Sequence, residues 1–551
     1  MSSGDETGSI ARNSTSAWAP LYSRVFRTLW FANAVSNIGT WMQNVGAAWL
    51  MTIVSGSPLL VALVQTATTL PVFLFSIPAG ALADLVDRRK LLIFSQMWML
   101  AAAGILGGLT IAGETGPWPL LGLTFALGIG ATLNWPAWQA VVPELVPRDQ
   151  LASAVALNSV GFNIARAVGP ALGGFVIAVS NTGAVFLLNA ASFIGVVAVL
   201  YYWKRTPREP GINGESVVSA IWTGMRYVRF APALHAVLIR VGVFALCASA
   251  LWALLPVMAS QRLGSGAGGY GVLLACLGTG SVIGASLLAK LRRRLTTDQV
   301  VAGGIVLFAF ATAGLAVLNN FAQVAIAMLF GGIAWMIVMS SFNVSAQIAL
   351  PHWVRARALS VYLLVFQGDM AVGSWLWGEA AARYSSRAAL LAAAAGLLIG
   401  IAALLHYKLR GIDNMDLTPS LHWPMPEMVT KFDPAEGPVL VTVEYEIEPP
   451  RAPEFIRAAQ ALGRIRRRDG ATRWGIFKDP SRPGRFIESF LVDSWGEHLR
   501  QHERVTVSDR ITEEQVHAFH IGDQSPLVTH WIAATTGNHG HGRHAGGRDI
   551  G

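Results

Sequence analysis

Long apolar segments dominate the chain from about residue 26 to residue 410. A transmembrane helix needs about 20 mostly apolar residues, and twelve segments meet this requirement. They begin near Phe26, Leu59, Leu91, Trp118, Ala152, Ala184, Ala233, Gly268, Val300, Ala322, Leu359 and Ala388. We therefore predict an all-α polytopic membrane protein with twelve spanning helices over most of the chain.

The longest polar gap among these segments, residues 204–230, divides them into two sets of six. It predicts a tail at 1–23, six-helix halves at 24–203 and 231–410, and a linker at 204–230. Within the linker, Ser219–Phe230 is amphipathic and predicts a helix at the membrane interface. Residues 1–20 lack the apolar core of a signal peptide, so we expect a cytoplasmic tail.

The two halves repeat a short pattern. Gly80 is followed eight residues later by a basic triplet, Arg88 to Lys90, and Gly284 is followed at the same distance by Arg292 to Arg294. The two copies are 204 residues apart. Two related six-helix halves, with the substrate site between them near the bilayer midplane, are typical of secondary transporters.

The pattern changes after residue 410. Residues 411–436 are rich in proline and charge and predict a linker, and the Gly- and His-rich residues 536–551 predict a disordered tail. Between them, residues 437–535 alternate in the order β-α-β-β-α-β, which predicts a small cytoplasmic α+β domain of the ferredoxin-like fold. The segments are strands at 439–447, 473–478, 485–491 and 528–533, and helices at 450–469 and 494–519.

Composition supports a bilayer location. The chain is 53% hydrophobic and only 13% charged, whereas soluble domains average about 25% charged residues. With the N-terminus placed inside, the inner segments hold 20 of the 25 Lys and Arg residues before residue 431, the outer loops three, and the spans two. Since basic residues are retained on the cytoplasmic side, we expect a plasma (inner) membrane protein with both termini cytoplasmic, and no nucleic-acid partner for the net charge of +9.

Polar residues inside the spans are the candidate transport residues. Arg166 lies about fifteen residues into its span, roughly 22 Å deep at about 1.5 Å per residue. A charge at that depth is costly and faces a cavity or a partner. Helical spacing places it on one face with Ser159 and Asn163, and it places Asn33, Asn37, Thr40 and Asn44 on one face of the first span. We expect both faces to line a central cavity, with hydrogen bonding between helices as the alternative.

Asp369 lies ten residues past the start of its span and is the only acid deep in the bilayer by this reading. We predict that it is the protonatable coupling group, and the alternative is an ion pair with Arg166 or with Arg240, the second basic residue within a span. Glu379 and Arg383 lie nearer the outer end and predict an interfacial ion pair.

Two motifs resemble signatures of the major facilitator superfamily. The segment Gly80–Lys90 looks like its loop 2–3 signature, and Gly169-Pro170-x-x-Gly173-Gly174 looks like the antiporter signature of drug:proton exchangers. The surrounding span, with Trp30, Gly39, Trp41 and Trp49 of the first span, is similar to the enterobactin-exporter-like, or transmembrane secretion effector, branch. The resemblance implies a proton-coupled exporter of a bulky siderophore or drug-like compound.

The resemblance also implies roles for individual residues. It implies that Gly80, Asp84, Arg88, Arg89, Gly284 and Arg292 form the gate motif, with Asp84 near Arg357. It implies that Gly169, Pro170, Gly173 and Gly174 form a hinge or seal between the halves. The fourth span has no arginine, although many drug antiporters carry one there, and Leu288 replaces the acid in the second loop copy.

No phosphate loop, His-Glu-x-x-His motif or nucleophile triad is present in residues 1–410. We expect a transporter and not an enzyme, with no cofactor and no bound metal, whose partners are a small-molecule substrate, protons and the lipid bilayer. Two alternatives remain open: a nutrient importer, and a transporter whose C-terminal domain is an enzyme or ligand sensor acting on the cargo.

The C-terminal domain resembles the dimeric α+β barrel domains of antibiotic-biosynthesis monooxygenases, which implies a possible homodimer formed through the sheets. We expect a regulatory or dimerising role. His498 and His502, spaced i, i+4, and His520 could be read as a metal or haem site, but we interpret them as a solvated helix face.

Overall fold

The computed structural model describes residues 17–203, 217–403, 407–409, 416–423 and 433–534. The chain forms two compact units. The first comprises Met1–Ala220, Ala233–Ala349 and Ala356–Asp413, and the second comprises Ile221–Pro232, Leu350–Arg355 and Asn414–Gly551.

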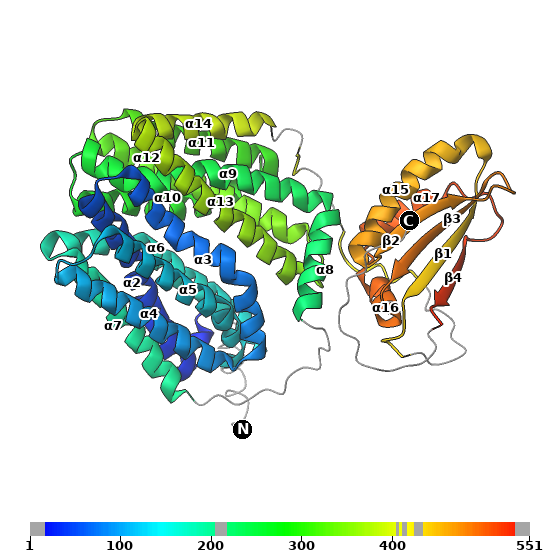
Figure 1. Cartoon of the computed structure of the whole chain (residues 1–551), viewed down its shortest axis with the longest axis horizontal. Coiled ribbons are helices and arrows are strands. Elements are labelled where there is room, and N and C mark those ends of the chain that lie inside the picture. Colours follow the sequence, from blue (N-terminus) through cyan, green and yellow to red (C-terminus); the bar gives the residue numbers. More distant parts are fainter. Residues whose placement is uncertain (1–16, 204–216, 404–406, 410–415, 424–432, 535–551) are drawn as a thin grey trace, which may run out of the picture. The chain divides into compact units, whose positions relative to one another are not determined.

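The first unit is a helical bundle, and Figure 1 shows its halves in blue to cyan and in green to yellow. After a short 3-10 turn, η1 (Ala19–Tyr22), the first half contains α2 (Arg24–Ser55), α3 (Pro58–Leu85), α4 (Arg88–Ile111), α5 (Pro117–Leu145), α6 (Leu151–Val179) and α7 (Thr182–Tyr202). The second half contains α9 (Pro232–Val257), α10 (Ala267–Arg292), α11 (Thr297–Val317), α12 (Phe321–Ile348), α13 (Arg355–Arg383) and α14 (Ser386–Ala403). In the sequence between the halves, a helix is present where the amphipathic segment predicts one, α8 (Val217–Phe230).

The first residue of every predicted span lies within four residues of the first residue of an observed helix. The helices begin slightly earlier than the apolar windows because polar capping residues and prolines form their first turns. Pro58 and Pro117 occupy first-turn positions, where no backbone N–H is needed. Asp87 accepts a hydrogen bond from the backbone N–H of Lys90 and caps α4.

Ten of the described helices are long and apolar enough to cross a membrane, which is fewer than the twelve predicted spans. The ten do not include α2, whose 32 residues carry the polar face of Asn33, Asn37, Thr40 and Asn44. They also do not include α14, whose described apolar stretch, Ser386–Ala402, is a shorter helix. The polytopic helical fold is therefore confirmed at the level of these ten spans.

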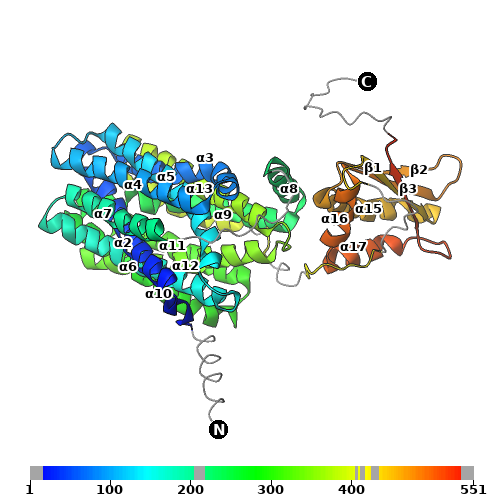
Figure 2. The ribbon, with the colours of Figure 1, turned by 90° about the horizontal axis from the view of Figure 1, so that it is seen from below.

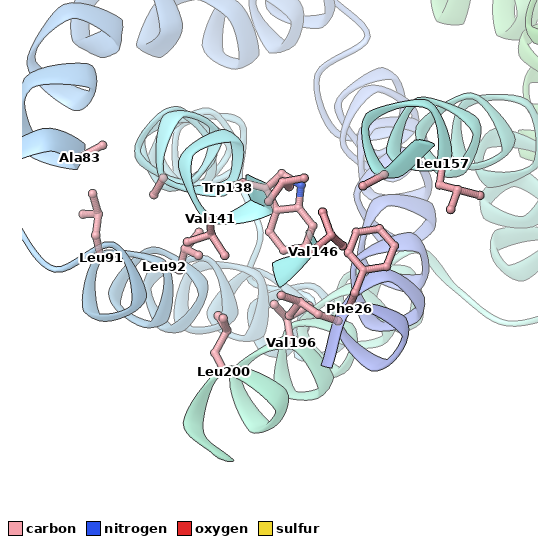
Figure 3. Close-up of a cluster of buried hydrophobic side chains, with 14 residues drawn as sticks. Phe26, Ala83, Leu91, Leu92, Trp138, Val141, Val146, Leu157, Val196 and Leu200 are labelled. Atoms are coloured by element: carbon pink, nitrogen blue, oxygen red, sulfur yellow. The ribbon is translucent and has the colours of Figure 1, made fainter. Parts of the chain in front are cut away.

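Each half has a hydrophobic cluster at the end where α2 begins. In the first half, Phe26 of α2, Leu92 of α4, Trp138 of α5 and Leu200 of α7 pack together (Figure 3). In the second half, Leu288, Val300 and Ile337 form a separate cluster. Among the described residues, each of these two clusters draws on one half only.

The opposite end of the bundle joins the halves. Val257 of the second half packs into a cluster with first-half residues, among them Leu50, Val61 and Phe186. Nearby, the rings of Trp49 and Tyr270 stack with centroids 6.2 Å apart. The Thr66 hydroxyl of α3 donates to the Ala371 carbonyl of α13 at 3.0 Å. The described contacts between the halves therefore gather toward the end that holds the α2–α3 turn.

The second unit contains an antiparallel four-stranded sheet in the order β2-β3-β1-β4. Its elements are β1 (Val439–Glu446), α15 (Ala452–Asp469), β2 (Arg473–Lys478), β3 (Arg485–Val492), α16 (Trp495–Arg504), α17 (Val507–His517) and β4 (Leu527–Ile532). Figure 2 shows α15, α16 and α17 together on one face of the sheet. Val439, Val441, Val443 and Tyr445 of β1 point into this layer and are buried.

The predicted elements of this unit are present within two residues at each end, and the second predicted helix is divided into α16 and α17. One feature of the predicted linker differs. Residues 416–423 of that linker pack on the domain, because Pro419 pairs with Thr506 and the Trp423 indole N–H donates to Glu513 at 2.9 Å.

Candidate transport site

The glycines of the antiporter-like segment let three helices approach closely. A Cβ atom on Gly169 would lie 2.5 Å from Cβ of Trp41, and one on Gly173 would lie 2.9 Å from Cα of Met42. Both neighbours belong to α2, so these glycines pack α6 inside the first half. Pro170 lies between them inside the helix and is buried.

Gly174 faces the other half of the bundle. A Cβ atom there would lie 2.7 Å from the Ala267 carbonyl oxygen and 3.0 Å from Cα of Gly271, both on α10. Gly271 in turn approaches the Pro170 carbonyl, 2.8 Å from where its own Cβ would be. Two turns further along α10, Gly278 packs on Ala167 of α6. The α6–α10 contact is therefore made by backbone against backbone, as small residues permit.

Arg166 lies between aromatic rings from both halves. Its guanidinium carbon is 5.9 Å from the ring centre of Trp41 in α2 and 6.0 Å from that of Trp252 in α9. These distances are at the outer limit of a cation–π interaction. The Nε atom is buried without a hydrogen-bond partner, and no ion pair of Arg166 is present among the described residues. The predicted neighbours Ser159 and Asn163 are exposed on the same helix.

The polar face of the first span is half-buried. Asn33, Asn37, Thr40 and Asn44 all have intermediate exposure, and the Thr40 hydroxyl donates to the Ser36 carbonyl of its own helix at 3.0 Å.

Asp369 lies on α13 against the second-half helix α9. A Cβ atom on Gly242 would lie 2.7 Å from its Oδ2 atom, so glycine makes room for the carboxylate. Asp369 is half-buried and has no ion pair among the described residues. The alternative prediction, an ion pair with Arg166 or Arg240, is not found there.

Arg240 has a different partner. Its guanidinium is buried and forms an ion pair with Asp298 in the first turn of α11. Asp298 also accepts from the backbone N–H of Leu409 at 3.1 Å. Arg240 thus ties α9 to α11 and to the segment after α14, and the sequence did not reveal this because the two residues are 58 positions apart.

The basic residues of the predicted gate hold the first half together. Arg88 forms an ion pair with Glu144 of α5 at 2.9 Å. Arg89 donates to the carbonyls of Leu200 and Tyr201 at the end of α7, at 2.7 and 2.5 Å. The side chain of Asp84, the predicted acid of this gate, lies outside the described residues.

The two gate glycines have different surroundings. A Cβ on Gly80 would meet nothing within 4 Å, whereas one on Gly284 would lie 2.7 Å from the Ile333 carbonyl oxygen of α12. At the end of the same helix, Arg292 donates to the Ser341 hydroxyl at 3.5 Å. The repeat in the sequence is therefore not a repeat of contacts.

Two buried polar pairs inside the first half were not predicted. Asn189 of α7 donates to Gln43 of α2 at 2.7 Å, and Gln96 of α4 donates to Asn134 of α5 at 3.1 Å. At the C-terminal end of α13, the predicted ion pair between Glu379 and Arg383 is present at 2.6 Å.

A family model described as "Transmembrane secretion effector" matches residues 15–537. The chain belongs to this family. It is a major facilitator transporter and not an enzyme, and the matched range includes the C-terminal domain as well as the bundle.

Curated relatives share a low sequence identity with this chain. The staphyloferrin A transporter of Staphylococcus aureus (strain NCTC 8325 / PS 47) is 23% identical over 62% of this chain and 85% of its own. The multidrug efflux pump Tap of Mycolicibacterium fortuitum is 23% identical over 70% of this chain and 96% of its own. The match to the MFS-type transporter YfiS of Bacillus subtilis (strain 168), at 26% identity, spans only half of that protein.

Among solved structures, a bacterial homolog of the human lysosomal transporter Spinster, in an inward-facing and occupied conformation, has a TM-score of 0.55. It is 16% identical and the alignment covers 70% of this chain and 97% of that one. This likeness shows the fold of the helical bundle.

The C-terminal unit has a charged core. Arg466 is buried and forms ion pairs with Glu488 at 3.3 Å and Glu513 at 2.9 Å. Its guanidinium carbon lies 4.7 Å from the ring centre of Trp423 and 5.2 Å from that of Phe490. Burial alone would raise the pKa of Glu513, but the charge of Arg466 and the hydrogen bonds of Glu513 hold that pKa well below its usual range.

The interpretation of the histidines as a solvated helix face is wrong for His498. Its side chain is only 1% exposed, and its Nε2 atom lies 3.4 Å from that of His502. The ring of His530 lies 4.8 Å from that of His498, between centroids. The described residues contain no group of three His, Cys, Asp or Glu side chains that could hold a metal ion.

Substitution of Gly174 tests the α6–α10 contact. We expect G174A to lower the Tm of the purified protein, because its methyl group meets backbone atoms and such overpacking costs about 1–3 kcal/mol. G195A is the matched control: a Cβ on Gly195 in α7 meets nothing within 4 Å, so its Tm should not fall. Equal Tm values for G174A and the wild type would contradict the close contact.

The C-terminal unit should lose stability in acid because it buries His498 and His502. Burial, together with the charges that neighbouring groups would carry, lowers the pKa of His498 to about 3 and of His502 to about 4. The unfolded chain takes up these protons near pH 6.5 and the folded one does not, so stability is complete above pH 6.5 and falls by about 1.4 kcal/mol per pH unit for each histidine as the pH drops toward 4.

Hydrogen exchange in α16 of the intact protein, corrected for intrinsic rates, measures this loss of stability. Protection should fall between pH 6.5 and 4.5 in the wild type and in H520Q, since His520 lies outside the histidine cluster. Constant protection over this range would contradict the prediction.

Proposed function

We propose that this transporter exports a bulky siderophore or drug-like compound across the plasma membrane, coupled to proton entry and working by alternating access. The efflux function of the relative Tap supports export, and the name of the staphyloferrin A transporter supports a siderophore as cargo. Membership of the family supports the secondary transport mechanism.

The observation that carries the proposal is a contrast between charges inside the bundle. Arg240 is buried but neutralised by Asp298, so it is a structural group and we leave it out of the transport pathway. Arg166 and Asp369 have no ion-pair partner among the described residues. An unpaired charge within the membrane is energetically costly, so a residue of this kind is usually retained for its function.

We assign Asp369 as the proton carrier, because a carboxylate beside Gly242 can alternate between charged and neutral states without breaking an ion pair. Arg166, flanked by Trp41 and Trp252, would hold an anionic or aromatic part of the cargo. Since Trp41 and Trp252 belong to different halves, cargo at this position would contact both.

The remaining candidate residues support these two. The faces formed by Asn33, Asn37, Thr40 and Asn44, and by Ser159 and Asn163, would line the path of the cargo. Gly174 and Pro170 would seal the halves against leakage where α6 meets α10, while Gly169 and Gly173 hold α6 against α2 within the first half. Gly80, Asp84, Arg88, Arg89, Gly284 and Arg292 would form the cytoplasmic gate. Both termini would be cytoplasmic, which is supported by the distribution of Lys and Arg.

Transport in proteoliposomes tests the coupling. With an imposed proton gradient, we expect wild-type protein to move cargo against its concentration gradient, and D369N to allow only equilibration, since its amide cannot carry a proton. R166Q is the matched control: it should slow transport at every gradient while remaining gradient-dependent. Wild-type coupling in D369N would rule out the assigned carrier, and inward accumulation of cargo in cells would favour the importer.

We also propose the complete domain plan. Twelve spans are supported by α2 and α14, which lie at the positions of the two remaining predicted spans. The ferredoxin-like assignment is supported by the strand order β2-β3-β1-β4 with the helices on one face. The division into 1–23, 24–203, 204–230, 231–410, 411–436, 437–535 and 536–551 follows, with residues 416–423 added to the domain.

The open face of the sheet supports self-association of the C-terminal domain. Register places Leu440 of β1 beside Trp531 of β4, and Trp531, Leu527 and Phe477 are each at least 60% exposed. An apolar sheet face of this kind is a typical interaction surface. We propose that a second copy covers it and forms a homodimer.

Native mass spectrometry of the full chain in detergent tests the homodimer. We expect a dimer for the wild type and a monomer for W531E, because the new carboxylate would be buried without a partner. I511E is the matched control, since Ile511 is exposed on α17, which covers the other face of the sheet. A monomeric wild type, or a dimeric W531E, would exclude this surface.

A further inference from the structure

The second unit includes two short segments that come from between membrane helices. These are Ile221–Pro232, which contains most of α8, and Leu350–Arg355, the turn between α12 and α13. Both are packed against the ends of α15 and α16 in the C-terminal domain. The domain residues that contact them are Arg468, Glu497 and Arg504. We call these three, together with Asp469 and Asp509, which bind Arg468, the docking surface.

Tyr227 of α8 is the centre of the contact. Its side chain is only 2% exposed. Its ring meets that of Trp353 edge-on, with centroids 5.7 Å apart, and the guanidinium carbon of Arg468 lies 5.5 Å from the Tyr227 ring centre. The two segments are therefore packed against each other as well as against the domain.

Trp353 carries the second cation–π contact. The guanidinium carbon of Arg504 lies 4.5 Å from its ring centre. Arg504 is fixed by hydrogen bonds to the Asp469 carbonyl at 2.7 Å and to Glu497 at 2.5 Å. Arg468 is fixed in the same way by Asp469 and Asp509, at 2.8 and 2.6 Å. Both cations are held in place by carboxylates of the domain, so little side-chain entropy is lost when they meet the rings.

One ion pair joins α8 directly to the domain. Arg226 donates to Glu497 at 3.1 Å, where Glu497 lies in the first turn of α16 and also pairs with Arg500 and Arg504. On the turn, Leu350 and Val354 are fully buried. Undocking would expose the buried ring of Tyr227 to water and separate both rings from their cations, which favours a contact that remains closed through the transport cycle.

The chain continues from both segments into transport helices. Pro232 begins α9, and Arg355 begins α13, the helix that carries Asp369. We propose that the C-terminal domain is a strut that binds α8 and the α12–α13 turn and makes the starts of α9 and α13 move as one body. This inference rests on the proposed transport function for its effect on turnover, but not for the docking itself.

Hydrogen exchange and transport measured on the full chain test the strut. In Y227A, which removes the central ring, we expect exchange to rise at least tenfold in both residues 221–232 and 350–357, and the transport rate to fall at least fivefold with cargo binding unchanged. Y227F keeps the ring and should retain most of the protection. W222A is the matched control, because Trp222 lies on the same helix but is exposed.

A second pair of variants keeps the proposal testable if Y227A does not fold. R226Q removes the ion pair from α8 to Glu497, whereas R500Q removes another partner of the same carboxylate that does not belong to α8. We expect only R226Q to raise exchange in residues 350–357. Unchanged exchange in Y227A or R226Q would overturn the docking surface, and faster exchange with a wild-type transport rate would overturn the strut but leave the exporter proposal intact.

Discussion

The close approach of α6 and α10 is the contact on which the bundle depends. Gly174 and Gly271 bring the two backbones together where any side chain would collide. In a bilayer, helices gain little from hydrophobic burial, so close van der Waals packing of this kind determines where they associate. The halves can then differ in their separation elsewhere while remaining joined along this line.

The bundle contains both paired and unpaired charges. Where the bundle needs cohesion, charges are paired, as in Arg88 with Glu144 and Arg240 with Asp298. Arg166 and Asp369 lie deeper by sequence and lack such partners among the described residues. A membrane protein pays for an unpaired charge, and this cost makes those two residues the strongest candidates for cargo and proton contacts.

Hydropathy and periodicity were sufficient to predict where the helices and strands lie along the chain, because these depend on local composition and period. They could not identify partners distant in sequence. The pairing of Arg240 with Asp298 depends on how α9 packs on α11. His498 was misread because a polar helix with an i, i+4 pair of histidines looks solvated, and only the fold of the domain buries it.

Paired spin labels on α6 and α10 would test the account most directly, in a chain whose two cysteines, Cys247 and Cys276, have been replaced. One pair at Val179 and Val272 reports the end near the α2–α3 turn, and one at Val155 and Leu287 reports the opposite end. Alternating access about the Gly174 contact predicts that acidification from pH 8 to 5 with cargo present shortens one distance and lengthens the other. Changes of the same sign at both ends, or none at either, would contradict it.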